Sequence, residues 1–296
     1  MDDVVADACH QMGLDGSDAR FVQHSANALF RLPKAGIMLR LSPEPVDYLI
    51  RITRALTAAG VPVAHLAPGV PQPVNAAGWW ATAWTLHPIL PNRLPAAALA
   101  RPLATLHRVE LPNLASWNLV SAIRALLMPL STADSTWPRV HLGLSMPQLI
   151  GRLLACCDEI EHGLATATWA LPAGTIHGDA HPGNLLRTAT GRVVLCDFDT
   201  IARGPRETDL VPAAHGVTRF GRERADYERF AERYGFDLLN APCWPILRRL
   251  RDLQLAIYLL PRLPADPVTS QQLEHRLRTV LGDDDSARWH RFTAFA

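Results

Sequence analysis

The apolar residues of this 296-residue chain change their spacing close to residue 90. Before that point they form short runs, at 28–32, at 37–41 and in the aromatic stretch 78–86. Short runs of this kind, separated by turn residues or rich in aromatic and β-branched residues, predict strands. After that point apolar residues recur every three or four positions, the spacing of amphipathic helices, as at Leu99, Leu103 and Leu106. The pattern predicts an α+β fold with an antiparallel sheet in the N-terminal part and helices in the C-terminal part.

Other elements of the N-terminal part follow from local signals. We expect a short helix over 4–13, a first strand starting at Phe21, a turn at 33–36, and a helix that ends at Gly60. The segment 87–95, HPILPNRLP, contains three prolines and interrupts regular structure. We therefore predict a boundary there, between an N-terminal lobe of residues 1–87 and a C-terminal lobe of residues 88–296.

Composition excludes several classes of protein. The net charge is +1, and no long charged tail indicates a nucleic-acid or membrane partner. The short basic run 248–251 is interpreted as a solvated helix face. The five cysteines are scattered, and no apolar run is long enough to span a membrane. The first residues lack the basic and apolar regions of a signal peptide, so we expect none. We expect a cytoplasmic protein that binds neither nucleic acid nor membranes, and the oligomeric state stays open.

The most polar stretch of the helical region is TIHGDAHPGNLL, residues 175–186. One hypothesis makes His177, Asp179 and His181 the ligands of a zinc hydrolase. Glycine and proline within the stretch disfavour the helix that would align the two histidines, and no third strong ligand is identifiable. The metal-dependent hydrolase is therefore kept as an alternative.

The second hypothesis is phosphoryl transfer, which needs a carboxylate to orient and deprotonate a hydroxyl and oxygen ligands for magnesium. Asp179 is the candidate base. Asn184 and Asp197 are the candidate ligands, and the intervening sequence predicts a strand, a turn and a second strand. Such a hairpin returns the chain to its starting point, so it brings the three side chains together.

The motifs HGDAHPGN and LCDFD together resemble the catalytic loop and the metal-binding segment of the aminoglycoside phosphotransferase and choline kinase family, relatives of protein kinases. The later stretch GPRETDL, residues 204–210, is similar to a third family segment. The resemblance implies a bilobal protein-kinase-like fold, with an antiparallel-sheet N-lobe and a mainly helical C-lobe. It also implies ATP-dependent phosphorylation of a small-molecule hydroxyl with Mg²⁺, with GTP left open as donor. The expected acceptors are an aminoglycoside or other antibiotic, an amino alcohol or a sugar.

The same resemblance implies roles for single residues. It makes Asp179 the catalytic residue and Asn184 and Asp197 the metal ligands. Supporting roles around the loop fall to His177, Asp199 and Asp209. Contacts with the nucleotide fall to Arg40 on the inner phosphates, Ser25 in the phosphate-covering turn, and Leu86 and His87 at the adenine.

One departure from the family pattern concerns the partner of Arg40. Kinase-like lobes pair the strand cation with a glutamate of the following helix, but residues 45–60 contain no glutamate. Either Glu44 or Asp47 at the start of that helix substitutes, or Arg40 is held without a partner. A catalytically impaired nucleotide-binding module is therefore a further alternative.

Overall fold

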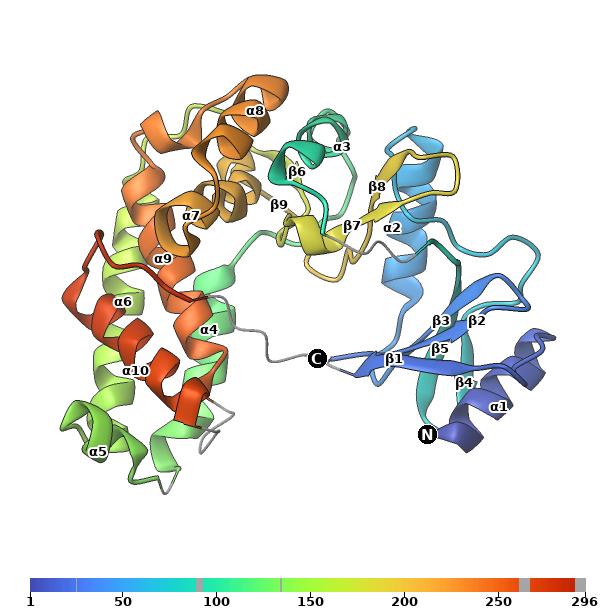
Figure 1. Cartoon of the computed structure of the whole chain (residues 1–296), viewed down its shortest axis with the longest axis horizontal. Helices are drawn as coiled ribbons and strands as arrows, with labels where there is room; N and C mark the ends of the chain where they lie inside the picture. Colours follow the sequence, from blue (N-terminus) through green and yellow to red (C-terminus); the bar gives the residue numbers. More distant parts are fainter. Residues whose placement is uncertain (25, 89–92, 134, 261–266, 291–296) are drawn as a thin grey trace. The chain divides into compact units, whose positions relative to one another are not determined.

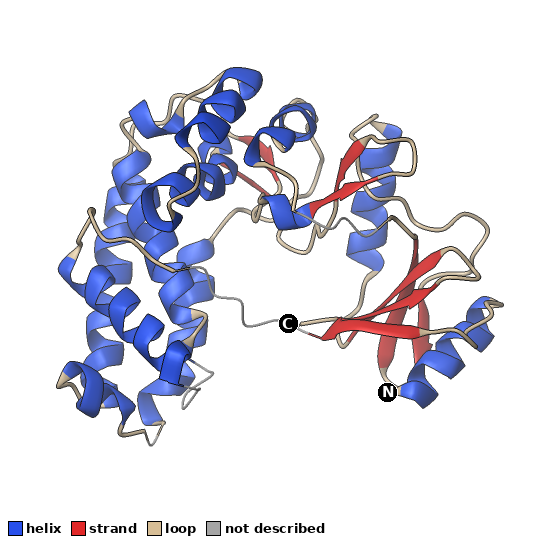
Figure 2. Cartoon of the chain, in the orientation of Figure 1, coloured by secondary structure: helices blue, strands red, loops and turns tan. Residues whose placement is uncertain are grey.

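The structure, a computed structural model, describes residues 1–24, 26–88, 93–133, 135–260 and 267–290. It confirms the α+β class, with strands concentrated in the N-terminal part and helices beyond it (Figure 2). The chain divides into two compact units. The first unit combines residues 1–114 with residues 177–201, and the second combines 115–176 with 202–296. The candidate catalytic stretch therefore belongs to the same compact unit as the N-terminal sheet.

The first unit is built on an antiparallel five-stranded sheet with the strand order β1-β2-β3-β5-β4 (Figure 1). Strands β2, β3 and β5 follow the predicted bounds to within one residue at each end, and alternate side chains of β2 and β3 are buried in a core. The short β4 strand was not predicted. The strands are β1 (Arg20–His24), β2 (Ala28–Leu32), β3 (Ile37–Ser42), β4 (Val74–Ala76) and β5 (Trp79–Thr85).

One face of this sheet packs against helix α1 (Asp2–Met12), which covers the predicted 4–13 segment. Val5, Cys9 and Met12 share a core cluster with alternate residues of β2 and β3, among them Leu39 and Leu41. Because successive side chains of a strand point to opposite faces, Arg40 projects from the face that α1 does not cover. Packing of Leu39 and Leu41 in the core under α1 therefore places the Arg40 side chain on the opposite face of the sheet.

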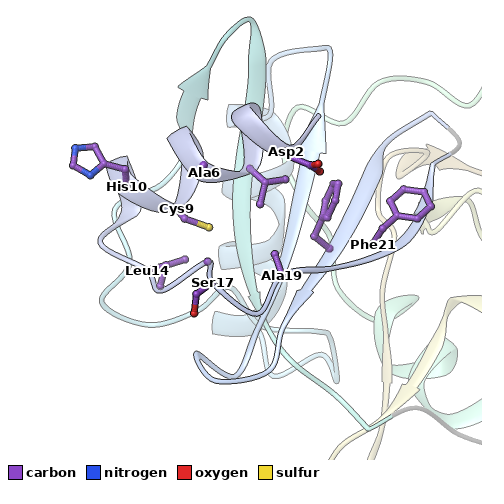
Figure 3. A pocket seen from close by; sticks show the side chains of 11 residues that line it. Asp2, Ala6, Cys9, His10, Leu14, Ser17, Ala19 and Phe21 are labelled. Atoms are coloured by element: carbon purple, nitrogen blue, oxygen red, sulfur yellow. The ribbon is translucent and has the colours of Figure 1, made fainter.

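A cavity of about 580 Å³ opens between α1 and the edge of the sheet (Figure 3). Its walls include Cys9 and Phe30, and the ring of Phe21 packs edge-on to Phe30 with 5.6 Å between centroids. Since these residues belong to the face covered by α1, the cavity and Arg40 lie on opposite sides of the sheet.

An extended segment after helix α2 (Asp47–Ala58) joins the sheet to the catalytic stretch. It pairs on one side with β5, where Thr85 N–H donates to the His65 carbonyl (2.9 Å). On the other side it pairs with β8 (Val193–Leu195), where Ala64 N–H donates to the Leu195 carbonyl (2.7 Å). Strand β8 forms the predicted hairpin with β7 (Leu185–Arg187). The extended conformation of residues 62–67 is therefore what holds the hairpin to the sheet. Helix α3 (Ala100–Leu106) also belongs to this unit and contacts β8.

The second unit is mainly helical. Helix α6 packs against α4 and α9, and α9 packs against α10. A short antiparallel pair, β6 (Gly174–Ile176) with β9 (Ala202–Gly204), immediately precedes and follows the stretch that belongs to the first unit. Sequence patterning missed this pair. The helices are α4 (Leu119–Leu127), α5 (Trp137–Leu142), α6 (Met146–Ala165), α7 (Val211–Phe220), α8 (Arg224–Tyr234), α9 (Trp244–Ile257) and α10 (Pro267–Gly282).

A buried ionic cluster joins helices α7 and α9. The Asp252 carboxylate accepts hydrogen bonds from Arg219 (2.5 and 2.9 Å), Arg248 (2.9 Å) and the His215 imidazole (2.8 Å). The interpretation of 248–251 as a solvated helix face is therefore wrong for Arg248, which is only 8% exposed. The charge is buried because it pairs with a carboxylate four residues further along the helix, a spacing that a basic run alone does not reveal.

The buried imidazole of His215 predicts that acid destabilises the second unit. Burial, together with the charges of Arg251 and Arg219, lowers the pKa of His215 to about 4 despite the hydrogen bond to Asp252. The imidazole of an unfolded chain titrates near pH 6.5. Between about pH 6.5 and pH 4 the unfolded chain binds a proton that the folded chain does not, so the free energy of unfolding falls as the pH falls, on the order of 1–3 kcal/mol.

Urea denaturation at pH 7, 6 and 5 measures this effect. The His215→Gln variant is expected to lose most of the slope between pH 6.5 and pH 5, because its side chain does not titrate. The control His10→Gln removes an exposed histidine and is expected to keep the slope of the native protein. Equal slopes for the native protein and His215→Gln would show that His215 is not the titrating group.

Candidate active site

The candidate catalytic loop lies between β6 and β7. Asp179 is half-buried, and the short 3₁₀ helix Pro182–Asn184 follows it. The amide of Asn184 donates to the backbone carbonyl of Asp179 (2.9 Å). Because the amide nitrogen is used in this way, the carbonyl oxygen of the Asn184 side chain is turned away from that contact. The two residues are thus held in one local structure, with the amide oxygen as a candidate ligand.

Asp197 is brought beside this loop by backbone pairing. The N–H of Cys196 donates to the carbonyl of Asn184 (3.0 Å), which continues the β7–β8 ladder to the residue before Asp197. Asp197 itself has a φ of 66°, a left-handed conformation that is unfavourable for a residue with a side chain and occurs often at functional sites. The structure therefore brings Asp179, Asn184 and Asp197 together, as the hairpin prediction required.

Asp197 lies among both acidic and basic side chains. Burial raises the pKa of the Asp197 carboxyl above its ordinary value, and the neighbouring Asp199 and Asp179 add to the effect, while Arg40 and His177 oppose it. Carboxylates that repel one another in a partly desolvated site are stabilised by a cation. One carboxylate and one amide oxygen are donors that suit magnesium better than zinc.

His177 is completely buried, and both of its ring nitrogens are used. Its Nε2–H donates to the carbonyl of Cys196 (2.9 Å), and its Nδ1 faces the N–H of Asp179 (3.4 Å). A neutral imidazole engaged on both sides has no lone pair to offer a metal. In the described ranges of the chain, no group of three or more His, Cys, Asp or Glu side chains is arranged to hold a metal ion. The hydrolase alternative is not favoured.

His181 is bound within the loop. Its Nδ1 accepts the N–H of Gly183 (2.9 Å), so the proton of the neutral ring lies on Nε2. That Nε2 is 3.4 Å from the Asp179 carboxylate. Of the two histidines, His181 is therefore the one that faces the candidate base.

Arg40 has a partner that neither sequence alternative named. Its Nη2 lies 2.5 Å from the Asp199 carboxylate, and the amide of Asn27 donates to the same oxygen (3.1 Å). Glu44 and Asp47 are exposed, and neither forms an ion pair within the described residues. Both expectations, a substitute at the start of the helix and an unpartnered Arg40, are wrong. Asp199 is distant in sequence, so only the tertiary structure reveals the pair.

The other residues predicted to contact the nucleotide are placed as follows. Ser25 lies outside the described residues. The N–H of Leu86 donates to the carbonyl of Gly36 (2.9 Å). The carbonyl of Leu86 is therefore the backbone group that remains for its predicted contact with adenine. The imidazole of His87 is half-buried, and burial lowers its pKa. These contacts with adenine stay predictions.

The GPRETDL segment belongs to the second unit. Asp209 is 1% exposed and lies in the 3₁₀ helix Arg206–Leu210, and its role as a support of the loop stays a prediction. Its neighbour Glu207 was not singled out from the sequence. The Glu207 carboxylate is buried and accepts the N–H groups of Ala170 and Leu171 (2.8 Å each), shortly before β6. An acidic residue inside a charged segment gives no sign that it is buried, so no sequence signal distinguishes it.

Comparison with known protein families shows to which family the chain belongs. The model of the phosphotransferase enzyme family matches residues 15–253. The protein belongs to this family. It is therefore an enzyme, a small-molecule kinase, and an impaired nucleotide-binding module is not favoured.

Solved structures of kinases share its fold. A choline/ethanolamine kinase family protein from Mesorhizobium loti is 16% identical, with a TM-score of 0.61 over 96% of each chain. The AMP-bound spectinomycin phosphotransferase APH(9)-Ia is 14% identical, with a TM-score of 0.65 over 95% of this chain and 98% of that one. The amicoumacin kinase hAmiN, in complex with AMP-PNP, Ca²⁺ and Ami, is 15% identical with a TM-score of 0.64 over 90% of this chain and 89% of that one. The predicted protein-kinase-like fold is confirmed.

A curated relative matches over a shorter region. The chloroplastic protein Activity of bc1 complex kinase 3 of Arabidopsis thaliana is 35% identical over 85 residues, which are 28% of this chain and 12% of that protein.

No helix in the described part of the chain has the length and apolar character needed to cross a membrane.

Gly178 is the position where the loop tolerates least change. Its φ is +84°, and a Cβ added there would lie 2.2 Å from the carbonyl oxygen of Thr200. The Thr200 hydroxyl donates to the carbonyl of His177 (3.0 Å), so the contact cannot open without breaking this bond. We expect Gly178→Ala to displace the loop, lowering kcat by about tenfold or more, since a misplacement of about 1 Å costs that much or more in catalysis.

Steady-state kinetics and thermal unfolding of Gly178→Ala measure this effect. The matched control is Gly191→Ala in the β7–β8 turn, where φ is also positive but a Cβ meets nothing within 4 Å. The control is expected to lose a little stability and keep its kcat. Equal kcat values for the two variants would contradict the steric role of Gly178.

Proposed function

We propose that the protein transfers the terminal phosphoryl group of ATP to a hydroxyl group of a small molecule. The observation that carries the proposal is the joint placement of Asp179, Asn184 and Asp197 in one compact unit with Arg40. A base, two oxygen ligands and a cation are what phosphoryl transfer requires of a protein.

Asp179 is the proposed base. Its carboxylate orients the acceptor hydroxyl and takes the proton as the oxygen bonds to the γ-phosphorus, while the bond from that phosphorus to the bridging oxygen breaks and ADP leaves. The half-buried carboxylate, beside the Nε2–H of His181, supports this assignment because it is partly accessible. His177 is proposed to support the loop through its two hydrogen bonds.

Asn184 and Asp197 are the proposed holders of Mg²⁺. Their oxygens match the ligands that this ion takes beside phosphate oxygens. When bound, the ion would neutralise the charge of the phosphate groups. The neighbouring Asp199 and Asp179 carboxylates favour a cation beside Asp197.

Arg40 is proposed to contact the inner phosphates, and Leu86 and His87 the adenine. The predicted lobes, residues 1–87 for the nucleotide and residues 88–296 for the catalytic loop and the acceptor site, stay a proposal. They differ from the two compact units, because residues 88–114 and 177–201 belong to the unit of the N-terminal sheet. The buried Nη1 of Arg40 has no hydrogen-bond partner in the described residues, which supports a ligand at that position. GTP is kept as an alternative donor.

The acceptor is proposed to be a small alcohol of one of four classes: aminoglycosides, other antibiotics, amino alcohols or sugars. Amicoumacin, spectinomycin and choline kinases share the fold, which supports these classes without choosing one. A coupled assay of ADP release across these four classes of alcohol, with ATP and GTP as donors, tests the proposal. If no alcohol of the four classes is phosphorylated, and mass spectrometry detects no phosphorylated product, the proposed function is contradicted.

The variant Asp179→Asn tests the base. It keeps the shape of the side chain and cannot accept the hydroxyl proton, so kcat is expected to fall by about 10²–10⁴-fold. The affinity for a non-hydrolysable ATP analogue, measured by calorimetry, is expected to stay within about threefold of the native value. Turnover at the native rate would exclude Asp179 as the base.

The variants Asn184→Ala and Asp197→Asn test the metal ligands. Each is expected to raise the Mg²⁺ concentration that gives half-maximal activity by about 10–100-fold, the range seen when groups around a metal are removed. The control is Asp15→Asn, an exposed carboxylate in the α1–β1 loop. An unchanged Mg²⁺ requirement in both variants would contradict the assignment.

A further inference from the structure

We propose that Asp199 is a positioning residue that orients Arg40 toward the nucleotide phosphates and replaces the helix carboxylate that α2 lacks. This inference rests on the proposed function. It assigns Asp199 neither to the metal nor to the reacting hydroxyl, but to the cation of strand β3.

The geometry of the pair is specific. Arg40 Nη2 and Asp199 Oδ2 are 2.5 Å apart, and Asn27 Nδ2 donates to the same oxygen at 3.1 Å. The Arg40 side chain is only 12% exposed, while Asp199 is 39% exposed. A charge-assisted contact in which one partner is largely desolvated is stronger than an ordinary surface ion pair.

The second terminal nitrogen of the Arg40 guanidinium, Nη1, is the group that the ion pair with Asp199 leaves for a ligand. Arg40 Nη1 is buried and has no hydrogen-bond partner in the described residues. A guanidinium is planar and rigid, so fixing Nη2 also fixes the direction of the N–H groups on Nη1. A buried donor without a partner costs free energy unless a ligand meets it, and a phosphate oxygen is a good acceptor for it.

No other described carboxylate is positioned for this task. The helix α2 has the sequence DYLIRITRALTA, without glutamate, and its only acidic residue is Asp47 in the first turn. Asp47 and the preceding Glu44 are exposed. The single ion pair of Arg40 among the described residues is the one with Asp199. The carboxylate that elsewhere would come from a helix comes here from the loop after β8.

The position of Asp199 also links Arg40 to the proposed metal ligand. Asp199 follows Asp197 by two residues, and Phe198 between them is 1% exposed and packs on the His177 ring with 5.1 Å between centroids. A buried ring in the middle of the loop limits independent movement of the residues on either side. We therefore expect the ion pair to keep the phosphate-binding cation and the metal ligand in a constant relative position.

The test compares three variants that each remove one carboxylate charge: Asp199→Asn, Glu44→Gln and Asp47→Asn. The Kd for Mg²⁺·AMP-PNP is measured by calorimetry without acceptor, together with the kinetic constants for ATP and for the acceptor. Asp199→Asn is expected to raise the nucleotide Kd and the KM for ATP by about tenfold, the effect of losing one charged hydrogen bond, with the acceptor KM within about twofold. The two control variants are expected to match the native protein.

A double-mutant cycle separates orientation from a general loss of structure. Arg40→Met is expected to weaken nucleotide binding, and adding Asp199→Asn to it is expected to cause little further loss, because the two residues act as a unit. Asp199→Glu keeps the charge and is expected to restore most of the affinity that Asp199→Asn loses. If thermal unfolding shows no folded state for Asp199→Asn, the variant Asn27→Ala replaces it. This variant removes only the second hydrogen bond to the same Asp199 oxygen, and the nucleotide Kd of Asn27→Ala is expected to rise about threefold.

The outcomes distinguish this inference from the proposed function. Native affinity in Asp199→Asn, or in Asn27→Ala where that variant replaces it, alongside weakened binding in Arg40→Met, would overturn the positioning role and leave the kinase proposal intact. Equal losses in Asp199→Asn and in the two control variants would also overturn it. If the native protein itself does not bind Mg²⁺·AMP-PNP, both the inference and the proposed function fail.

Discussion

The backbone hydrogen bonds of residues 62–67 are the contacts on which the site depends. Along one edge this segment pairs with β5, through Thr85 N–H to the His65 carbonyl and Ala67 N–H to the Ala83 carbonyl. Along the other edge it pairs with β8, through Ala64 N–H to the Leu195 carbonyl and Leu195 N–H to the Pro62 carbonyl. A single extended segment thus joins the N-terminal sheet to a hairpin more than a hundred residues later, and Arg40 and Asp197 come to lie in one compact unit.

Within that unit, the balance of charge explains why the site suits a cation and phosphates. Burial raises the pKa of Asp197, the charges of Asp199 and Asp179 add to this effect, and Arg40 and His177 oppose it. One arginine does not neutralise three carboxylates. A divalent ion bound with a nucleotide would bring both the positive charge that the carboxylates favour and the acceptors that the Arg40 guanidinium favours.

Several features were predictable from the sequence because they depend on neighbouring residues. The β2 and β3 strands follow from short apolar runs with a turn between them, and the β7–β8 hairpin follows from the same signal. The short strands β4, β6 and β9 were missed, because none of these three-residue segments is an apolar run beside a turn. Arg248 was misinterpreted because its burial depends on Asp252 and on the packing of α9 against α10, which a basic run does not reveal.

The sequence by itself determined the class of fold and the candidate base and metal ligands, because Asp179 and Asn184 precede, and Asp197 follows, a single hairpin whose closure is local. Only the tertiary structure decided the partner of Arg40. Asp199 lies 159 residues further along the chain, and the helix that was expected to supply the carboxylate lies much nearer in sequence. Spacing along a chain predicts contacts within an element or a hairpin, whereas a contact between distant segments depends on how those segments pack.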